Sequence, residues 1–507
     1  MKTKLLTLIL ALLSFANYTQ TYIEDLNFEA YLEANSMGDG IAGNHYVTTS
    51  NINTVENLDI SGLGIQSMIG IEDFAALKTL NCSSNNLLQT LNVFNNIALT
   101  ELRCFNCDIT SLTLPNNNLL SYLSCGNNNL TGLDVSSYPL LTYLACSNNG
   151  SNNLGTLDLS MNTNLITLYC QNSGVSGLDI SQSPNLDLLV CYDNSFPTLD
   201  ISGNTALSEI RCYNSGINTF TIANSNYTNL TYLDCSDNPI GSLNLSYFPN
   251  LETLYCAYNN LNTLNVSTNT QLVNFGCWNN NLSSLDVSNN SLLNYFECGN
   301  NTLLSNNLIL PTNKTALTSL WVYNIGTSSL NYSDYLQLVD LDIGLNNFTT
   351  ADVSMLQFLN QFYCNGNQLT SLDISNGHND TLTWMWAQNN GANLCIQVDD
   401  LVVAGGKSSP QWQRDIGSTF SLNCTLGSNE FDLSQVMIHP NPANDRFYID
   451  LPIEANYTLS NMFGQFIRKG ALFSGKNELA INALKSGLYL LNLESAQGRA
   501  IKKIIKK

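Results

Sequence analysis

Basic residues and histidines are scarce in this chain of 507 residues. The sequence has 18 lysines and arginines against 39 acidic residues, which gives a net charge of −21, and it has three histidines. Between positions 21 and 430 only six residues are basic and 33 are acidic. Nucleic-acid binding needs positive charge gathered on one face. We therefore exclude DNA and RNA as partners.

Recognisable catalytic motifs are also missing. His45, His378 and His439 lie far apart, and no serine and aspartate recur beside them in the pattern of a nucleophilic triad. The sequence has no phosphate-binding loop, no HExxH motif and no G-x-S-x-G motif. We expect a protein that is not an enzyme, with no catalytic residue and no cofactor.

Long apolar runs are missing too, apart from a short one at the N-terminus. Lys2 and Lys4 precede the apolar run from Leu5 to Leu13, and the small residues Ser14 and Ala16 follow. This order is typical of a signal peptide, here residues 1–16, with a cleavage site as late as residue 20 as the alternative. No later stretch reaches the ~20 apolar residues of a membrane span. We expect an exported chain without a transmembrane segment.

Cysteine, in contrast, is abundant and periodic. The sequence repeats the frame Leu-x-x-Leu-x-Cys-x-x-Asn-x-Leu, as at Leu230 to Ile240 and Leu251 to Leu261. A unit of this size cannot bury its own apolar face, so it must stack on its neighbours. The pattern predicts a solenoid in which each unit adds one short strand to a parallel sheet. Twelve cysteines share the frame position: Cys82, Cys104, Cys125, Cys146, Cys170, Cys191, Cys212, Cys235, Cys256, Cys277, Cys298 and Cys364.

This frame resembles that of leucine-rich repeats, with cysteine as the third apolar residue. Ile60 opens the series, Val322 and Ile343 continue it without cysteine, and Ala387 closes it, which makes about sixteen turns. The resemblance implies an α/β-type repeat solenoid that is mostly β, a right-handed arc with a parallel sheet on its concave side. The recurring asparagine is expected to bond the backbone of the turns with its buried amide.

The periodic cysteines are interpreted as buried free thiols. A cysteine in place of leucine acts as a small apolar residue, and neighbouring parallel strands point their side chains the same way, which is awkward for a disulfide. A metal-binding thiolate row is the alternative, but paired C-x-x-C spacing is lacking apart from Cys104 and Cys107. Cys395 and Cys424 lie beyond the last expected turn and flank an irregular segment with Trp412. We expect these two to form a disulfide in the C-terminal cap.

Aspartates form a second periodic row, because many units carry Leu-Asp-x-Ser. Stacking brings these carboxylates close together, and their repulsion needs compensation. One explanation is that each accepts hydrogen bonds from serine and backbone groups of its own turn; the other is weak Ca²⁺ binding between turns. We predict no metal site. The row consists of Asp134, Asp158, Asp179, Asp200, Asp286 and Asp373.

Aromatic residues gather at outward positions that flank the inward leucine and cysteine. Strand propensity alone favours tyrosine and tryptophan there, but an exposed aromatic stripe suits recognition of an extracellular protein or glycan. The stripe is densest in the C-terminal half of the arc. The predicted binding residues are Tyr232, Tyr255, Tyr258, Trp278, Tyr295, Trp321, Tyr323, Tyr363, Trp384 and Trp386.

The composition changes abruptly near Glu430. Residues 431–507 carry ten basic and six acidic residues, and short alternating segments predict a small β-sandwich. The motifs of this tail resemble those of the type A C-terminal sorting domain of bacterial type IX secretion. The resemblance implies that this machinery exports the protein, which is then either secreted or held on the outer cell surface of a Gram-negative bacterium. The motif residues are Pro440, Asn441, Pro442, Gly487, Tyr489, Lys506 and Lys507.

The expected domain order follows from these segments. It is a signal peptide (1–16), an N-terminal cap (21–56), the solenoid (57–394), a C-terminal cap with linker (395–430) and the sorting domain (431–507). In the N-terminal cap, one helical face is expected to hold Leu26, Phe28, Tyr31 and Leu32. We expect an adhesin-like binding protein. A structural surface or biofilm coat is the alternative, and an extracellular enzyme is least favoured.

Overall fold

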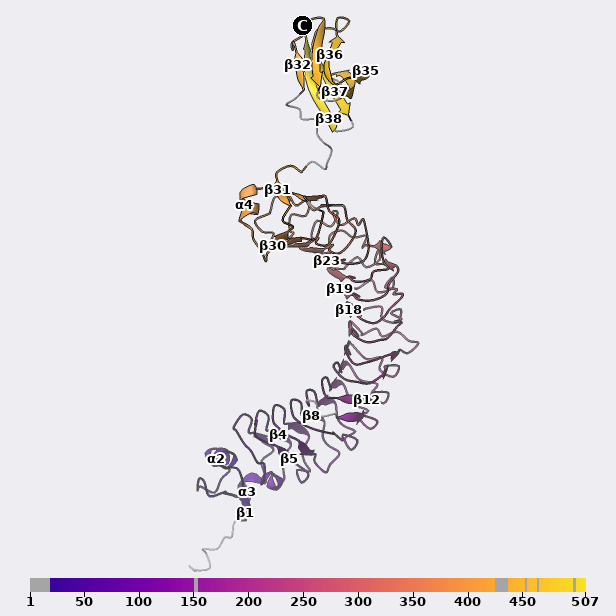
Figure 1. Ribbon diagram of the computed structural model, residues 1–507. Coiled ribbons are helices and arrows are strands. Elements are labelled where there is room, and N and C mark those ends of the chain that lie inside the picture. The colour runs from indigo at the N-terminus through magenta and orange to yellow at the C-terminus, as the bar shows by residue number, and fades with distance from the viewer. Residues whose placement is uncertain are drawn as a thin grey trace, which may run out of the picture.

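A computed structural model of the protein describes residues 19–149, 154–391, 393–424, 436–451, 454–462, 465–495 and 498–507. The expected signal peptide lies outside the described residues. Two separate hydrophobic cores are present. The first runs from Ile23 to Trp412 through an arc of stacked turns, and the second runs from Val436 to Ile504 through a small sandwich of strands (Figure 1).

The concave side of the arc is one parallel sheet of seventeen short strands (Figure 1). It begins with β3 (Asn57–Asp59), ends with β30 (Trp412–Arg414), and pairs each strand in register with the next. The strands between them are β4 (Thr79–Asn81), β6 (Glu101–Arg103), β8 (Tyr122–Ser124), β9 (Tyr143–Ala145), β11 (Thr167–Tyr169), β13 (Leu188–Val190), β15 (Glu209–Arg211), β17 (Tyr232–Asp234), β18 (Thr253–Tyr255), β19 (Asn274–Gly276), β21 (Tyr295–Glu297), β23 (Ser319–Trp321), β24 (Asp340–Asp342), β26 (Gln361–Tyr363) and β28 (Trp384–Ala387).

A second row of strands lies on the outer side of the turns, as β5 and β12 show in Figure 1. These strands are parallel and form smaller sheets. They are β5 (Thr90–Asn92) with β7 (Ser111–Thr113), β10 (Gly155–Asp158) with β12 (Val175–Asp179), β14 (Thr198–Asp200) with β16 (Thr219–Thr221), β20 (Leu285–Asp286) with β22 (Leu308–Ile309), and the set β25 (Thr350–Asp352), β27 (Ser371–Asp373), β29 (Cys395–Gln397) and β31 (Thr419–Ser421).

Leucine, cysteine and asparagine fill the space between the two rows. In the turn of β17, Leu233 and Cys235 are fully buried. The Asn238 side chain donates to the backbone oxygens of Cys212 and Cys235, both at 3.0 Å, and accepts from the Ile217 amide at 2.9 Å. One amide thus ties together consecutive turns whose backbone groups no strand satisfies. Thirteen cysteines, the twelve of the frame and Cys107, are free and buried.

The repeat continues further than the sequence analysis expected. The expectation that Ala387 closes the series and that Trp412 lies in an irregular segment is wrong, because β30 pairs with β28 and places Trp412 opposite Met385. Trp412 is 5% exposed, and its Nε1 donates to the Leu382 backbone oxygen at 3.0 Å. This turn does not match the repeat frame, because a tryptophan occupies the inward position and the helix α4 (Leu401–Gly406) is inserted between the two strands.

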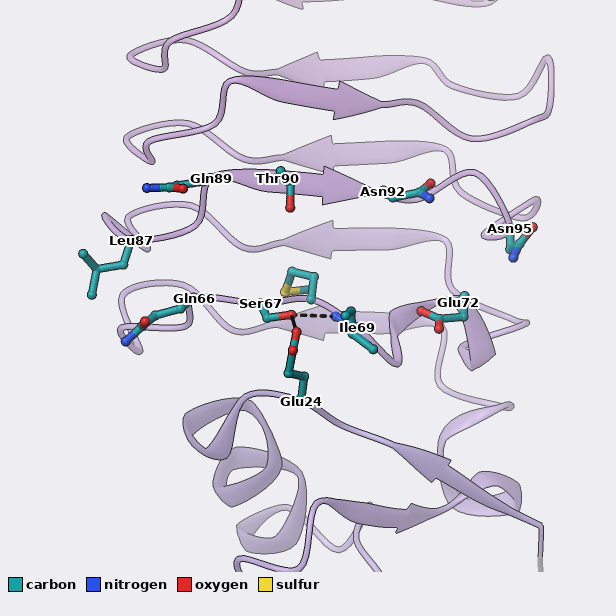
Figure 2. A pocket seen from close by; sticks show the side chains of 11 residues that line it. Glu24, Gln66, Ser67, Ile69, Glu72, Leu87, Gln89, Thr90, Asn92 and Asn95 are labelled. Carbon is teal, nitrogen blue, oxygen red and sulfur yellow. Dashed lines mark hydrogen bonds between the residues drawn. The ribbon is translucent and has the colours of Figure 1, made fainter.

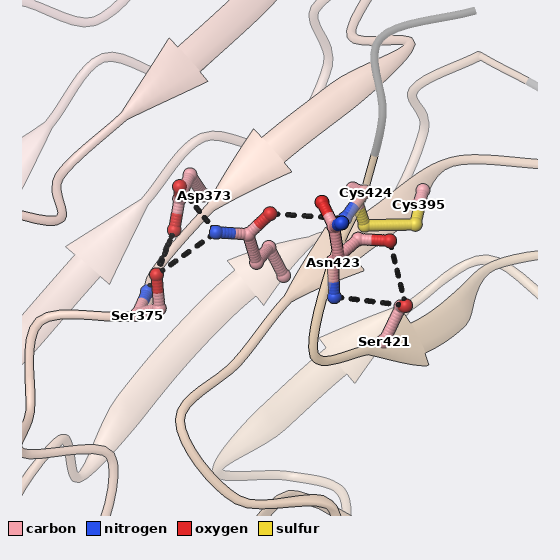
Figure 3. The surroundings of a disulfide bond; sticks show 7 residues. Asp373, Ser375, Cys395, Ser421, Asn423 and Cys424 are labelled. Carbon is pink, nitrogen blue, oxygen red and sulfur yellow. Dashed lines mark hydrogen bonds between the residues drawn. A yellow bond between two sulfur atoms is a disulfide. The ribbon is translucent and has the colours of Figure 1, made fainter. Parts of the chain in front are cut away.

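The disulfide joins Cys395 of β29 to Cys424, with their Cα atoms 5.7 Å apart (Figure 3). Gln397 connects this bond to the preceding turn, because its Nε2 donates to Asp373 Oδ2 at 2.8 Å and its Oε1 accepts from the Cys424 amide at 2.9 Å. Cys395 therefore lies within the outer sheet and not beyond the last turn.

At the N-terminus, an antiparallel pair, two short helices and a 3₁₀ turn cover the end of the stack. They are β1 (Gln20–Tyr22), α2 (Leu26–Ala34), β2 (Tyr46–Thr48), α3 (Thr49–Ile52) and η1 (Ile71–Asp73). Phe28 and Leu32 are buried and Tyr31 packs against them, but Leu26 is 53% exposed, so its expected place on the buried face is wrong. Glu29 is buried instead, and its Oε1 accepts from the Asn44 amide at 2.9 Å.

The C-terminal strands form two antiparallel sheets around the second core. One sheet has the order β32 (Met437–His439), β33 (Arg446–Leu451) and β36 (Gly475–Ala480). The other has the order β35 (Phe466–Leu472), β34 (Ala455–Asn461), β37 (Gly487–Ser495) and β38 (Gly498–Lys506). Alternate residues such as Phe447, Ile449, Leu491 and Leu493 are buried between the sheets.

Candidate functional site

Each concave strand presents its first and third residues on the side opposite its buried middle residue. Because the strands pair in register, the third residues form a column along the arc, with about 4.8 Å between neighbouring strands. We call this the third-position column. Carboxylates and aromatic rings share it in the C-terminal half. From β17 to β28 it reads Asp234, Tyr255, Gly276, Glu297, Trp321, Asp342, Tyr363 and Trp386.

In the N-terminal half, this column holds two arginines with partners on the same face. The Arg103 guanidinium lies 4.7 Å from the Tyr122 ring centroid, and its Nε donates to Glu101 Oε1 at 2.6 Å. Tyr122 in turn stacks on Tyr143, with ring centroids 4.3 Å apart. These side chains are thus partners of one another.

The second arginine repeats the arrangement of the first. The Arg211 guanidinium lies 4.8 Å from the Tyr232 ring, and its Nε donates to Glu209 Oε1 at 2.5 Å. The chain therefore twice places its own cation between a carboxylate and a tyrosine ring.

In the C-terminal half, the concave face opens into a pocket of about 320 Å³. The Tyr363 ring meets the Trp386 ring edge-on with centroids 5.0 Å apart, and it meets the Trp321 ring edge-on at 6.5 Å. Asp342 lies on the strand between Trp321 and Tyr363. We call this the aromatic pocket. Its lining residues are Trp321, Tyr323, Asp342, Gly344, Leu345, Tyr363, Asn365 and Trp386.

The carboxylate of the aromatic pocket is held in a setting that disfavours its charge. The pKa of Asp342 is raised to about 7, mainly by burial. A hydrogen bond from the Gly344 amide at 2.8 Å acts to lower this pKa, and the nearby charge of Glu297 acts to raise it. No lysine or arginine is among the residues that line the pocket. The lining of the pocket therefore offers Asp342 no cationic partner.

Glu297 shows how a second carboxylate of the column is satisfied. It is 7% exposed and accepts hydrogen bonds from the hydroxyl groups of Tyr295 and Tyr323, the latter at 3.2 Å. Burial raises the pKa of Glu297, and the two hydroxyl groups lower it. A Cβ atom at Gly299 would overlap the Tyr323 ring, so glycine there lets this ring lie across the strand and reach Glu297.

Leu345, another lining residue, has a costly backbone conformation. Its φ is 55°, in the left-handed region, where the neighbouring turns have Asn300, Asn324 and Gly366. A left-handed conformation costs an ordinary L-residue roughly 1–2 kcal/mol, and Leu345 nevertheless leaves its side chain 52% exposed. Tyr258 is the other large side chain at this turn position, with φ 54° and 50% exposure. Strain of this kind is characteristic of functional sites.

The structure brings the predicted aromatic residues together in two groups. Trp321, Tyr323, Tyr363 and Trp386 line the pocket. Ring contacts of 6.4 to 6.5 Å link Tyr255 to Tyr232, Trp278 and Tyr295. Trp384 lies outside the lining, with its ring 6.5 Å from that of Trp386. Tyr258 stands at its turn rather than on a strand.

Sequence reasoning missed Asp342, Glu297 and Leu345. For Leu345 the available signal was the break in the asparagine and glycine pattern at the left-handed turn position. No such signal marked Asp342 or Glu297.

The aspartate row and the histidines show no shared site. Asp134 Oδ1 accepts from the Ser136 amide at 2.9 Å and from its hydroxyl at 2.6 Å, and the other five aspartates also accept from the serine two residues later. His45 lies 3.0 Å from the Ile23 backbone oxygen, while the His439 ring lies beside Tyr448 in the sandwich. Within the described ranges, no three His, Cys, Asp or Glu side chains gather as a metal would need.

A larger hollow of about 610 Å³ lies between the N-terminal cap and the first outer strand (Figure 2). Its polar groups bond one another, since Ser67 Oγ donates to Glu24 Oε2 at 2.5 Å and accepts from the Ile69 amide at 3.3 Å. Glu72, also in its lining, accepts from the Gly70 amide at 2.9 Å. We interpret this hollow as a gap where the N-terminal cap packs against the solenoid, and we place the candidate site in the aromatic pocket.

The predicted sorting residues meet at one end of the C-terminal sandwich. Asn441 donates to the Lys503 backbone oxygen at 2.7 Å and accepts from the Ile505 amide at 2.8 Å. Gly487 pairs with Lys506 in the sheet, and the Lys507 amide donates to the Ala443 oxygen at 2.9 Å. Pro440 and Pro442 flank Asn441, and Tyr489 donates its hydroxyl to the Lys485 oxygen at 2.8 Å. The prolyl segment and the terminal lysines are thus joined directly.

Comparison with known families agrees with both parts of this architecture. The model of the secretion system C-terminal sorting domain matches residues 437–507, and a model of leucine-rich repeats in two copies matches residues 228–269. These two regions of the chain are thus similar to a sorting domain and to leucine-rich repeats. That domain points to secretion or to the surface of a Bacteroidetes-type bacterium. No helix of the described part is long and apolar enough to cross a membrane.

Solved structures show that this chain has the leucine-rich-repeat fold. It is similar to the functional domain of InlJ from Listeria monocytogenes, described as including a cysteine ladder, with 24% identity, a TM-score of 0.60, and coverage of 96% of this chain and 99% of that one. YopM from Yersinia enterocolitica WA-314 is 20% identical with a TM-score of 0.50, covering 72% and 91%. Comparison with curated proteins returned no match. At these identities the similarity establishes the fold alone.

Proposed function

We propose that this protein is an adhesin-like binding protein that recognises an extracellular protein or glycan through the concave face of its solenoid. The observation that carries the proposal is the aromatic pocket. Three rings from three strands line it together with one carboxylate, and Leu345 keeps an exposed apolar side chain in a strained turn. Aromatic anchors in a pocket are typical of the residues that dominate binding energy.

Binding is favoured over catalysis because the polar groups around the pocket are not arranged as an acid and a base. Glu297 is held by two tyrosine hydroxyl groups, and the described histidines lie elsewhere. Asp342 has a raised pKa, but the pocket presents no nucleophile beside it. We therefore assign no catalytic residue.

The test is binding of the mature full-length chain to arrays of glycans and of extracellular proteins. Trp321→Ala and Trp386→Ala should each weaken binding by roughly 2 kcal/mol, about thirtyfold, with little change in melting temperature. Tyr192→Ala is the matched control, because Tyr192 is on the same face but stacks on Tyr213 with centroids 4.3 Å apart. Unchanged binding with lowered melting temperature in the tryptophan variants would favour the structural coat.

We also propose that residues 431–507 are the part that the type IX machinery recognises. The Asn441 side chain supports this, since it fixes the prolyl segment to the terminal strand. Removing the tail should leave the solenoid folded but retained in the periplasm, because the two cores are separate. Cell fractionation and surface proteolysis measure the outcome, and normal surface display without the tail would refute the assignment.

A further inference from the structure

The two arginine clusters of the N-terminal half show what the concave face does with a carboxylate beside an aromatic ring. In both, a guanidinium lies within 5 Å of a tyrosine ring, at 4.7 and 4.8 Å, and donates to a glutamate. A cation over an aromatic face is attracted by the ring quadrupole, and the carboxylate adds a hydrogen bond. Three parts thus make one satisfied unit.

The aromatic pocket repeats two of these parts without the third. Trp321, Tyr363 and Trp386 supply the rings, and Asp342 supplies the carboxylate. The sequence contains no lysine or arginine between Lys314 and Lys407. In the N-terminal half the chain supplies a cation of its own to the carboxylate and the ring, whereas the lining of the aromatic pocket contains none.

The nearest cations along the chain are engaged with other groups. Lys314 Nζ donates to the Tyr335 hydroxyl at 3.0 Å. Lys407 Nζ donates to the backbone oxygens of Asp380 and Leu382 at 3.0 and 3.1 Å. The Arg414 guanidinium lies 4.5 Å from the Phe420 ring. None of these three residues therefore supplies a counter-charge to Asp342.

We propose that the aromatic pocket binds the cationic side chain of a lysine or arginine presented by a protein partner, with the positive charge beside Asp342. This inference rests on the proposed function and names the chemistry of its ligand. The rings of Trp321, Tyr363 and Trp386 contact the stem and the charge, and the exposed Leu345 side chain adds apolar surface for the methylene groups.

The surroundings of the pocket favour a basic protein segment over a lipid surface or a neutral glycan. Residues 21–430 carry a net charge of −27, which attracts basic partners over a distance. The residues that line the pocket belong to strands and turns of the concave sheet. Because the arc curves around that side (Figure 1), a flat bilayer would meet the two ends of the arc first. A neutral glycan would leave the charge of Asp342 without a counter-charge.

The experiment uses peptides of uncharged glycine and serine residues with a single lysine, arginine or norleucine at the centre. Norleucine keeps the apolar stem and removes the charge. Calorimetry and tryptophan fluorescence with the mature full-length chain should show the basic peptides binding about tenfold tighter than the norleucine peptide. Asp342→Asn should abolish this difference. The matched control is Asp286→Asn, because Asp286 accepts from Ser288 on the outer row.

Several outcomes overturn the inference. Equal binding of the three peptides, a charge preference retained in Asp342→Asn, or no response to either basic peptide at millimolar concentration each does so. Phosphatidylcholine vesicles and neutral oligosaccharides are tested in parallel. If either binds in a manner that needs Trp386 and that the lysine peptide does not compete with, the pocket belongs to that ligand.

Failure of the inference is distinguishable from failure of the proposed function. If an array ligand needs Trp321 and Trp386 but not Asp342, the concave face still binds a partner and the cation assignment alone is wrong. If no array ligand needs either tryptophan, both proposals are wrong. Melting temperatures of all variants show whether a loss of binding reflects loss of the fold.

Discussion

Arg103 and Asp342 occupy the same outward strand position in two halves of one sheet, with different consequences. Arg103 has a glutamate and a tyrosine as partners on this face. Asp342 lines a pocket together with aromatic rings and has no counter-charge among the other lining residues. The repeat frame constrains the inward residues of every turn alike. It leaves the outward residues free to differ, and that is where binding specificity can arise.

The first prediction checks that the two halves are equivalent at inward positions. Leu102→Ala in β6 and Leu341→Ala in β24 remove fully buried side chains at the same place in the frame. Each should lower the free energy of unfolding by about 3 kcal/mol, because the cavity between stacked turns cannot collapse. Chemical denaturation of the two variants measures this. A large loss in only one of them would mean that the halves differ in packing and not only in their surfaces.

The inward residues are also what made the fold predictable. Leucine, cysteine and asparagine recur at fixed spacing, so each turn gives the same information again, and the parallel sheet follows. The strand β30 was not predicted, because Trp412 occupies the position where the repeat frame has leucine. Leu26 was misplaced because its helix has only nine residues and Glu29 is buried on it instead.

The site was predictable only in part. Aromatic residues at outward positions marked the face, but the state of a carboxylate depends on neighbours one turn away in space and more than twenty residues away in sequence. The strand register places Asp342 next to Trp321 and Tyr363, and the sequence alone does not give that register. For the same reason, spacing alone does not reveal that Glu297 is satisfied while Asp342 is not.

The second prediction sharpens the comparison through pH. The pKa of Asp342 is raised to about 7 in the folded protein, from an ordinary value of 3.8. Between these values the folded state keeps a proton that the unfolded state has lost, so stability falls as pH rises from about 4 to about 7. Asp342→Asn should remove this fall and raise stability at pH 8 by on the order of 1–2 kcal/mol, less than the full shift gives, because the carboxylate is partly open to solvent.

Melting curves between pH 4 and pH 8 decide this prediction, with Asp286→Asn as the control. Groups near Asp342 are Glu297 on β21, Asp340 on its own strand, and Tyr323 and Tyr363 on either side. Affinity for a lysine peptide should rise over the upper part of this range, because only the ionised carboxylate attracts a cation. An affinity that is flat from pH 6 to pH 8 would contradict the assigned role of Asp342.

The third prediction concerns the strained turn beside the pocket. Leu345→Asn should raise the free energy of unfolding by about 1 kcal/mol, because asparagine accepts the left-handed conformation at lower cost. The same change should weaken binding, since it removes exposed apolar surface from the pocket. The reverse change, Asn324→Leu, should lower stability by at least as much, because it also removes a hydrogen bond of 2.7 Å to Asn300. Thermal denaturation and peptide binding on the same samples test both. A lower stability in Leu345→Asn would show that this leucine supports the fold and not a ligand.

The fourth prediction, which has the smallest expected effect, concerns Arg103 in the N-terminal half of the sheet. Arg103→Met removes the ion pair between Arg103 and Glu101. Because the Arg103 side chain is 42% exposed, the free energy of unfolding should fall by only about 0.5 kcal/mol, and by less at high salt. The change leaves a glutamate beside the Tyr122 ring without its cation, which is the condition that we infer for Asp342. Arg103→Met should therefore gain weak affinity for the lysine peptide, and Arg103→Met with Glu101→Gln should not. Calorimetry on the two variants measures this gain. If the single variant binds no better than the double one, a carboxylate and a ring on this face are not enough to attract a cation, and the hollow shape of the aromatic pocket must contribute the difference.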